Sequence, residues 1–353
     1  MTIIYFLILL SMIIVIHEAG HLLAAKKFGV YCYEFAFGMG PLIWQKKGKE
    51  TKYSIRAIPI GGYVSMAGET DGDEMYPDVE VPDDRRLINR PWWQRIIILL
   101  AGVTMNFLLA WLIFSLVILA QGAFAESPPA IVGSVRENSP AEAAGFQPGD
   151  VILEISKEDG SSVKPKTFMD MQTFFMDDTE TVTYTVKRGD EVLQLEVVPA
   201  YSEEDGTYLI GISSGDVVVH EVNLLNCWYY GGKEMGEITA LMIRTIRNLF
   251  RGIGLNQLSG PVGIYQATET YAAMGLMSLL FLMAELSLNI GIFNLLPLPV
   301  LDGGQVVLTL AEVITGKKIN DKFKMGLFAV CWIALIALML FATWNDISRL
   351  FGF

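Results

Sequence analysis

The stretch IIYFLILLSMIIVIHEAGHLLAAKK occupies residues 3–27 and carries no charge before Glu18. A helix needs about 20 apolar residues to cross a bilayer, so this stretch predicts a membrane-spanning helix. A secretory signal peptide is the competing interpretation, but no basic segment precedes the apolar run and no small-residue cleavage site precedes Lys26. The predicted first span therefore contains ionisable side chains.

Three further stretches are apolar enough to span a membrane: Ile96 to Ala120, about 272–296, and Met325 to Thr343. The 353-residue chain is 52% hydrophobic and only 18% charged, against about 25% charged residues in ordinary soluble domains. Its net charge of −12 argues against nucleic acid as a partner. The composition indicates a protein of the lipid bilayer with a soluble insert.

The predicted orientation follows from the basic residues of the short loops. Lys and Arg are concentrated in residues 26–95 and again in residues 317–324, so we expect both stretches on the cytoplasmic side. The N-terminus and the long region 121–271 then lie outside. The three cysteines are separated by this topology, and we expect no disulfide among them.

The regions outside the spans differ in kind. Residues 33–66 alternate apolar and polar side chains around a Lys-rich turn and predict a β-hairpin, whereas the acidic residues 69–84 predict a flexible cytoplasmic loop. Residues 128–200 predict a compact α/β module, and the string S-P-A-x-x-A-G-x-x-P-G-D at 139–150 makes this module similar to a bacterial PDZ domain. Residues 224–251 predict an amphipathic helix on the outer membrane surface rather than a fifth span.

The chemistry begins at His17-Glu18-Ala19-Gly20-His21. Residues i and i+4 project from one face of a helix, so both imidazoles can reach one metal ion. Glu18 can then act as general base on a metal-bound water. The alternative is that these polar groups sit at a helix end and reach toward the interface, but intramembrane ionisable groups are costly and usually functional.

A catalytic zinc site needs three protein ligands, and the candidate for the third is Asp302. It lies in Asn294-Leu-Leu-Pro-Leu-Pro-Val-Leu-Asp302-Gly-Gly, directly after the third predicted span. By the predicted topology this span ends at the same membrane depth as His17 and His21. The alternative is an aspartate that only caps the next helix; considered together with the histidines, the metal interpretation is favoured.

The HExxH of the first span, the N-x2-P-x-P-x-L-D-G-G motif and a PDZ-like insert resemble the site-2 protease family, in particular the bacterial proteases that regulate sigma-factor release. Shorter matches are at residues 37–41, 61–64 and 258–264, and one departure is Val103, where the family usually has proline. The resemblance implies an intramembrane endopeptidase with a Zn2+ cofactor, situated in the bacterial inner membrane with its active site near the cytoplasmic face. It implies single-pass membrane substrates, either anti-sigma factors or remnant signal peptides.

The resemblance also implies that Asn289 and Asn294 hold the substrate, although helix–helix hydrogen bonding is a common alternative for such residues. Glu285 matches no motif and is interpreted as a structural polar group. A membrane-anchored PDZ adaptor without catalysis is the main competing function, and it would leave the buried His17, Glu18 and Asp302 without a role. A zinc-dependent transporter would need charged groups spread over several spans.

The sequence thus predicts a mainly α multi-pass membrane protein with four transmembrane helices, a cytoplasmic or membrane-associated β-hairpin and one extracytoplasmic α/β PDZ-like domain. The predicted segments in chain order are the first transmembrane helix at 1–27, the hairpin and acidic loop at 28–91, the second transmembrane helix at 92–121, the PDZ-like domain at 122–215, the membrane-surface helix region at 216–270, the third transmembrane helix at 271–303, and the cytoplasmic loop with the fourth transmembrane helix at 304–353.

Overall fold

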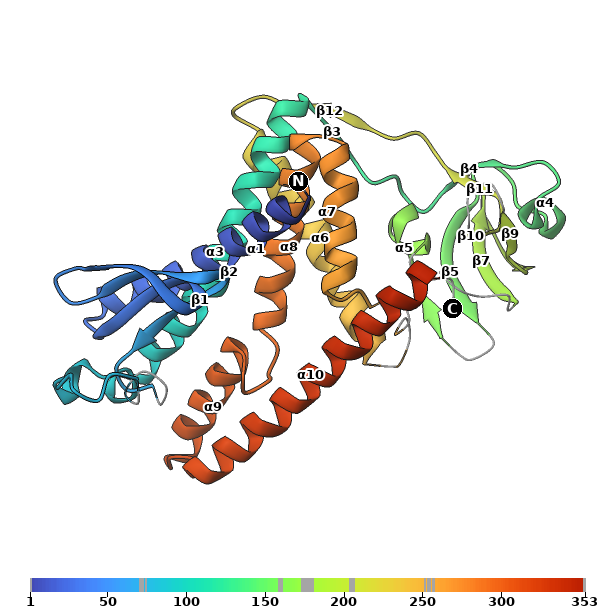
Figure 1. Cartoon of the computed structure of the whole chain (residues 1–353). Coiled ribbons are helices and arrows are strands. Elements are labelled where there is room, and N and C mark those ends of the chain that lie inside the picture. Colours follow the sequence, from blue (N-terminus) through green and yellow to red (C-terminus); the bar gives the residue numbers. More distant parts are fainter. Residues whose placement is uncertain are drawn as a thin grey trace. The chain divides into compact units, whose positions relative to one another are not determined.

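The computed structural model (Figure 1) describes residues 2–69, 73, 75–157, 161–172, 181–202, 207–250, 252, 255 and 258–351. The chain forms two compact units. Unit 1 comprises Met1–Val117 and Leu225–Phe353, and unit 2 comprises Ile118–Leu224. Unit 1 contains the predicted spans and every predicted site residue, so unit 2 is inserted into the chain between the two halves of the site.

Among the described residues, four helices are long and apolar enough to cross a membrane, which confirms the four predicted spans by length and composition. The helices are α1 (Thr2–Lys27), α3 (Trp92–Gln121), α8 (Leu276–Asn294) and α10 (Asp321–Phe351). The first three share one core, in which Ile13 of α1, Phe114 of α3 and Leu288 of α8 are almost fully buried. Helix α10 exposes most of its apolar side chains, as expected for a helix whose surroundings are lipid.

Unit 1 also contains the helices α6 (Cys227–Leu249), α7 (Pro261–Ala273) and α9 (Asp302–Thr315). Helix α6 matches the predicted amphipathic helix. Helix α7, most of which falls within the predicted membrane-surface region 216–270, packs against α1, α8 and α10; the membrane-surface placement stays a prediction. The chain turns at Gly275, whose φ of 110° separates α7 from α8.

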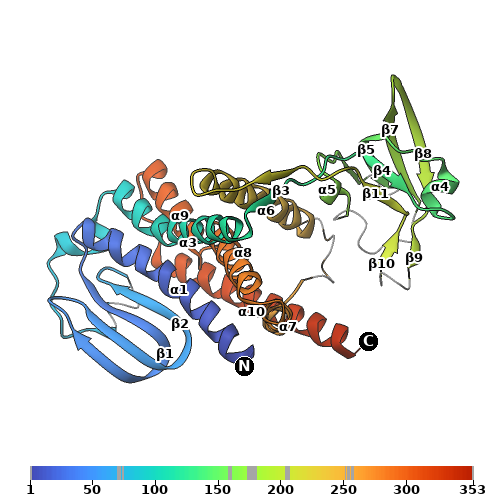
Figure 2. The ribbon, with the colours of Figure 1, turned by 90° about the horizontal axis from the view of Figure 1, so that it is seen from above.

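The predicted hairpin is formed by β1 (Cys32–Lys47) and β2 (Lys52–Met66), and Figure 2 shows it beside α1. It is more folded than a simple hairpin, because Phe35 of β1 pairs with both Val64 and Tyr53 of β2. Residues 34–37 of β1 therefore lie between the two ends of β2. The predicted closing glycines at 61–62 lie inside β2, where a Cβ on Gly62 would come within 2.7 Å of the Ala36 carbonyl oxygen.

Some residues of the predicted acidic loop contact the rest of unit 1. Part of the loop, residues 70–72 and 74, lies outside the described residues. Of the rest, Asp73 accepts hydrogen bonds from the Tyr33 hydroxyl (2.9 Å) and the Gly68 amide (3.2 Å), and Val81 is buried. Two short 3-10 helices follow, η1 (Asp83–Arg85) and η2 (Leu87–Asn89). The contact between Asp73 and Tyr33 is long-range and leaves no local pattern in the sequence; the flexibility of the loop stays a prediction.

Unit 2 contains the elements predicted for the α/β module. A four-stranded sheet has the order β6-β5-β7-β8, and its core includes the fully buried Ile152, Ile155 and Tyr184. Ser139 caps the short helix α4, which ends at Gly145 in the left-handed conformation, as the 139–150 string predicts. The elements of the unit are β3 (Ala123–Ala125), β4 (Val132–Val135), α4 (Pro140–Ala144), β5 (Val151–Lys157), β6 (Ser162–Val163), α5 (Phe168–Gln172), β7 (Val182–Arg188), β8 (Glu191–Val197), β9 (Ala200–Ser202), β10 (Thr207–Leu209), β11 (Ile212–Ser214) and β12 (Val219–Glu221).

Three smaller strand pairs, β3 with β12, β4 with β11 and β9 with β10, accompany this sheet. No disulfide joins Cys32, Cys227 and Cys331, all of which lie among the described residues.

Candidate metal centre

The two histidines of the HExxH motif meet on one face of α1. His17 and His21 are one helical turn apart, both are buried, and their Nε2 atoms are 3.1 Å apart. The helix forms here because the apolar run continues on both sides of the motif without proline, and Gly20 is accommodated by a tight helix crossing. A Cβ on Gly20 would collide with the carbonyl oxygen of Ala101 on α3. This crossing brings α3 close to both imidazoles.

Asp302 reaches the same point from the other end of the chain. Its Oδ2 lies 3.1 Å from His17 Nε2 and 3.5 Å from His21 Nε2. The segment between α8 and α9 contains two prolines, which end α8, and Asp302 is the first residue of α9. A Cβ on Gly303 would collide with the Leu295 carbonyl oxygen, and one on Gly304 with that of Leu298. The two glycines therefore let this segment fold tightly enough to aim Asp302 at the histidines.

The three donor atoms have the spacing of a zinc site. Ligands at about 2.0–2.2 Å in tetrahedral directions are about 3.4 Å from one another, and the observed separations are 3.1, 3.1 and 3.5 Å. Oδ2 of Asp302 is buried and has no hydrogen-bond partner in the part of the chain that the structure describes. A buried carboxylate oxygen that accepts no hydrogen bond is costly, and a cation between it and the two imidazoles would satisfy it.

Groups around the histidines orient their rings. His21 Nδ1 lies 2.8 Å from the carbonyl oxygen of Ile98, an acceptor, so Nδ1 carries the proton and Nε2 is free to bind a metal. The amide of Asn106 lies 3.4 Å from His17 Nδ1, and its Oδ1 is buried without a partner. Turning this amide by half a turn would let Oδ1 accept a hydrogen bond from the Nδ1–H group of His17 and would give His17 the same tautomer as His21.

Gly102 on α3 leaves the space that the two histidine rings occupy. A Cβ at this position would lie 2.7 Å from Cε1 and 2.8 Å from Nε2 of His17, and it would collide with His21 Nε2. Nothing larger than glycine fits without moving a ring.

Sequence reasoning missed the roles of Gly102 and Ile98, because a glycine inside an apolar span and a backbone carbonyl give no distinctive signal. The role of Asn106 could have been suspected, because Asn106 is a lone polar side chain in that span.

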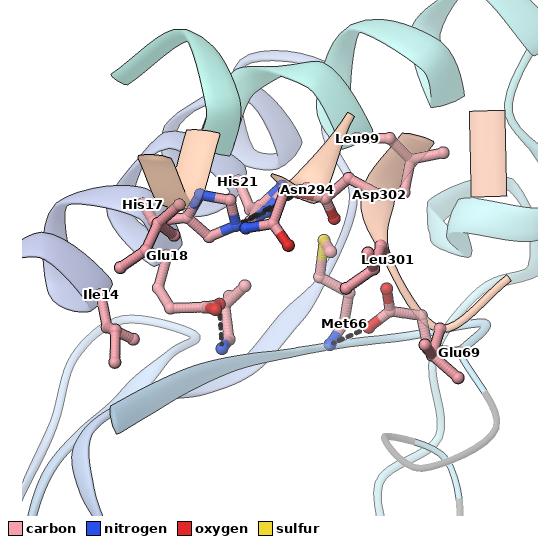
Figure 3. Close-up of a pocket in the computed structure, with 13 residues that line it drawn as sticks. Ile14, His17, Glu18, His21, Met66, Glu69, Leu99, Asn294, Leu301 and Asp302 are labelled. Atoms are coloured by element: carbon pink, nitrogen blue, oxygen red, sulfur yellow. Dashed lines mark hydrogen bonds and ion pairs between the residues drawn. The ribbon is translucent and has the colours of Figure 1, made fainter. Parts of the chain in front are cut away.

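A cavity of about 320 Å3 opens beside this centre (Figure 3). Glu18 and Asn294 both line it, together with Glu69, which the sequence analysis did not single out. Glu18 is not part of the three-residue cluster, and its Oε2 accepts a hydrogen bond from the Val64 amide of β2 at 3.1 Å. Asn289 is not among the lining residues. The substrate-holding roles of Asn289 and Asn294 both stay predictions. The remaining lining residues are Ile14, His17, His21, Val64, Met66, Leu99, Ile290, Val300, Leu301 and Asp302.

Comparison with known families decides the class of protein. The model of peptidase family M50 matches residues 5–338, nearly the whole chain. The chain belongs to peptidase family M50. This confirms the resemblance to site-2 proteases and makes the chain a zinc metalloprotease. With its four apolar helices, this member of family M50 is a multi-pass membrane protein whose cofactor is Zn2+.

Relatives that cover nearly the whole of this family M50 chain include two proteases named RasP. It is 32% identical to the regulator of sigma-W protease RasP of Bacillus subtilis, over 99% of both chains. It is 31% identical to the zinc metalloprotease RasP of Shouchella clausii, over 99% of this chain and 100% of the relative. Among solved structures, it is similar to the PDZ domain of an SdrC-like protein from Listeria monocytogenes, with 27% identity over 25% of this chain and 90% of that chain and a TM-score of 0.21. The PDZ assignment of unit 2 stays a prediction.

Proposed function

We propose that the chain is an intramembrane endopeptidase in which His17, His21 and Asp302 hold the zinc ion and Glu18 is the general base. The observation that carries this proposal is the convergence of three donor atoms at ligand spacing from α1 and from the start of α9. A PDZ adaptor would have no use for this cluster. The crowding of α3 against the imidazoles at Gly102 further supports a centre whose geometry is constrained from several sides.

When bound, Zn2+ would act as a Lewis acid on the scissile carbonyl and lower the pKa of water to about 7. The residues of the chain supply the rest. Glu18 follows His17 in the same helix as His21 and faces the cavity. It takes the proton of the attacking water and delivers it to the leaving amine. Asn294 faces the same cavity and can donate its amide N–H to a substrate carbonyl; we assign Asn289 to the same task as a more distant contact.

The substrate class follows from the place of the site within the predicted first span. A transmembrane helix uses its peptide groups in its own hydrogen bonds, so it must unwind locally before a peptide bond can be cut. The hairpin next to the cavity offers β2 as a strand to which the unwound segment can pair. We therefore propose single-pass membrane proteins as substrates, either remnant signal peptides or, by analogy with the relative named for sigma-W regulation, anti-sigma factors.

The basic loops support a placement in the bacterial inner membrane with the metal centre near the cytoplasmic face and unit 2 outside. Unit 2 then takes no part in hydrolysis. We propose that it controls which substrates approach, either by docking a peptide end or by excluding bulky outer domains.

The test separates the base from the ligands. Glu18→Gln should abolish cleavage of a single-span substrate and leave one zinc ion per chain, because Glu18 is assigned to the water and not to the metal. Asp302→Ala should lower both zinc content and cleavage. Glu285→Gln is the matched control, since Glu285 is another acid of a predicted span that does not line the cavity. Full activity of Glu18→Gln, or stoichiometric zinc in Asp302→Ala, would contradict the assignment.

A further inference from the structure

One end of β2 forms an open sheet edge at the metal centre. Residues 62–66 pair on one side with β1, as Val64 with Phe35 and Met66 with Cys32. Among the described residues, no strand other than β1 pairs with β2. The other side of residues 62–66 faces the cavity, because Val64 and Met66 are both among its lining residues.

Two carboxylates occupy the backbone donors of this edge (Figure 3). The Val64 amide donates to Oε2 of Glu18 at 3.1 Å, and the Met66 amide donates to Oε2 of Glu69 at 3.4 Å. Alternate residues of a strand direct their N–H groups to the same edge, so these two amides are consecutive donors for a neighbouring strand. Their acceptors come from outside the sheet, Glu18 from α1 and Glu69 from the turn that follows β2.

Glu69 is held in this position by its own turn. Its backbone amide donates to the Met66 carbonyl oxygen at 3.3 Å while its side chain accepts from the Met66 amide. The side chain therefore competes for the Met66 donor at a high local concentration. A substrate whose carbonyls are engaged in helical hydrogen bonds has no acceptor to offer in exchange.

We propose that Glu69 is a specificity-determining residue that guards the 62–66 edge together with Glu18. An extended, unwound segment of a transmembrane substrate docks there as an added strand, and its carbonyl oxygens replace the two carboxylates on the Val64 and Met66 amides. This inference rests on the proposed function. It deepens that function because the docked segment displaces Glu18, the proposed general base, from the Val64 amide. A substrate that remains helical cannot displace Glu18, which then stays hydrogen-bonded to Val64.

The first test removes the guard. Glu69→Ala opens the Met66 donor, so the KM for a purified single-span substrate in detergent should fall roughly three- to tenfold, the range of one net hydrogen bond. The kcat and the zinc content should stay unchanged. Glu69→Gln keeps an acceptor at the same place and should restore the wild-type KM. Glu80→Ala removes an acid from an exposed position of the same loop and is the control for charge alone.

The proposed role of Glu69 also predicts a change in the preference between substrates that unwind easily and substrates that do not. Wild-type protein should favour a substrate span containing a helix-breaking Gly-Pro pair over an otherwise identical Leu-rich span, and Glu69→Ala should narrow that ratio. A residue that merely supports the turn would instead lower kcat or zinc content when it is replaced. The KM, the preference ratio and the zinc content therefore distinguish a guard from a structural cap.

Hydrogen–deuterium exchange gives a readout that needs no change at Glu69. In the Glu18→Gln chain, the bound single-span substrate should protect the amides of residues 62–66 more strongly than the free chain does. Unchanged exchange there, or a KM and preference in Glu69→Ala equal to those of the wild type, would overturn the inference while wild-type cleavage still supported the proposed function. Absence of cleavage by the zinc-loaded wild type would instead refute the proposed function itself.

Discussion

The closest contact at the metal centre yields a prediction about a residue that carries no functional group. In Gly102→Ala, the new Cβ would collide with His21 Nε2 and would lie 2.8 Å from His17 Nε2. Favourable contacts begin at about 3.5 Å, so the His17 ring would have to move by about 0.7 Å and the His21 ring by more than that. Metal–ligand distances tolerate only about 0.2 Å, so the two imidazoles cannot both keep their places around one ion.

The expected result is a large loss of zinc with a retained fold. Changes to groups that merely orient zinc ligands cost about 10- to 100-fold in affinity, and we expect Gly102→Ala to reach at least the upper end of that range. The strain itself should destabilise the chain by about 1–3 kcal/mol, which leaves the helices formed. Gly326→Ala is the matched control, because it makes the same change in α10, where nothing lies within 4 Å of the new Cβ.

The assay is the zinc content of detergent-purified protein, measured by mass spectrometry after dialysis against graded chelator. Circular dichroism of the same samples reports the helix content. Gly102→Ala should lose zinc at chelator concentrations that leave the wild type and Gly326→Ala loaded. One tightly held zinc ion per chain in Gly102→Ala, with wild-type activity, would refute the assignment of the metal site to this crossing of α1 and α3.

Two further predictions concern unit 2. Burial alone would raise the pKa of Asp150, but hydrogen bonds from the Arg188 guanidinium (2.7 Å) and the Gln147 amide (2.9 Å) outweigh burial and hold the pKa below its usual value. The ionised Asp150 carboxylate therefore stabilises the folded state fully above about pH 3.9, the pKa of an unfolded aspartate. This stabilisation is lost as the pH falls through the lower pKa of the folded state. Asp150→Ala should destabilise unit 2 by about 3 kcal/mol, which thermal unfolding of the full chain would measure. The loss of stability of unit 2 at acidic pH should also become smaller in this variant. An unchanged loss at acidic pH would contradict the pairing of Asp150 with Arg188. The second prediction concerns the replacement of residues 128–200 by a short Gly/Ser linker. The variant should keep its zinc and should still cleave a substrate without an outer domain, but it should discriminate less against a substrate that retains its outer domain. An undiminished preference for the substrate without the outer domain would show that another part of the chain selects substrates.

Much of the architecture could be predicted from the sequence because its signals are local. Apolar length marks the four spans, alternation marks β1 and β2, and the string at 139–150 marks a capped helix followed by a tight turn. The spacing of His17 and His21 also places both on one helix face without any knowledge of the rest of the fold. Each of these features depends on residues within one helix, one strand or one turn.

Tertiary structure alone decided what these elements do to one another. The sequence suggested Asp302 as a partner of the histidines, but the spacing of the three donor atoms depends on two glycines that let the segment before α9 fold tightly. The fit of α3 against the imidazoles at Gly102 and the contact between Glu18 and the edge of β2 leave no pattern in the sequence. Such contacts join residues far apart in the chain, and their existence depends on sub-ångström packing between helices and a strand that no local periodicity encodes.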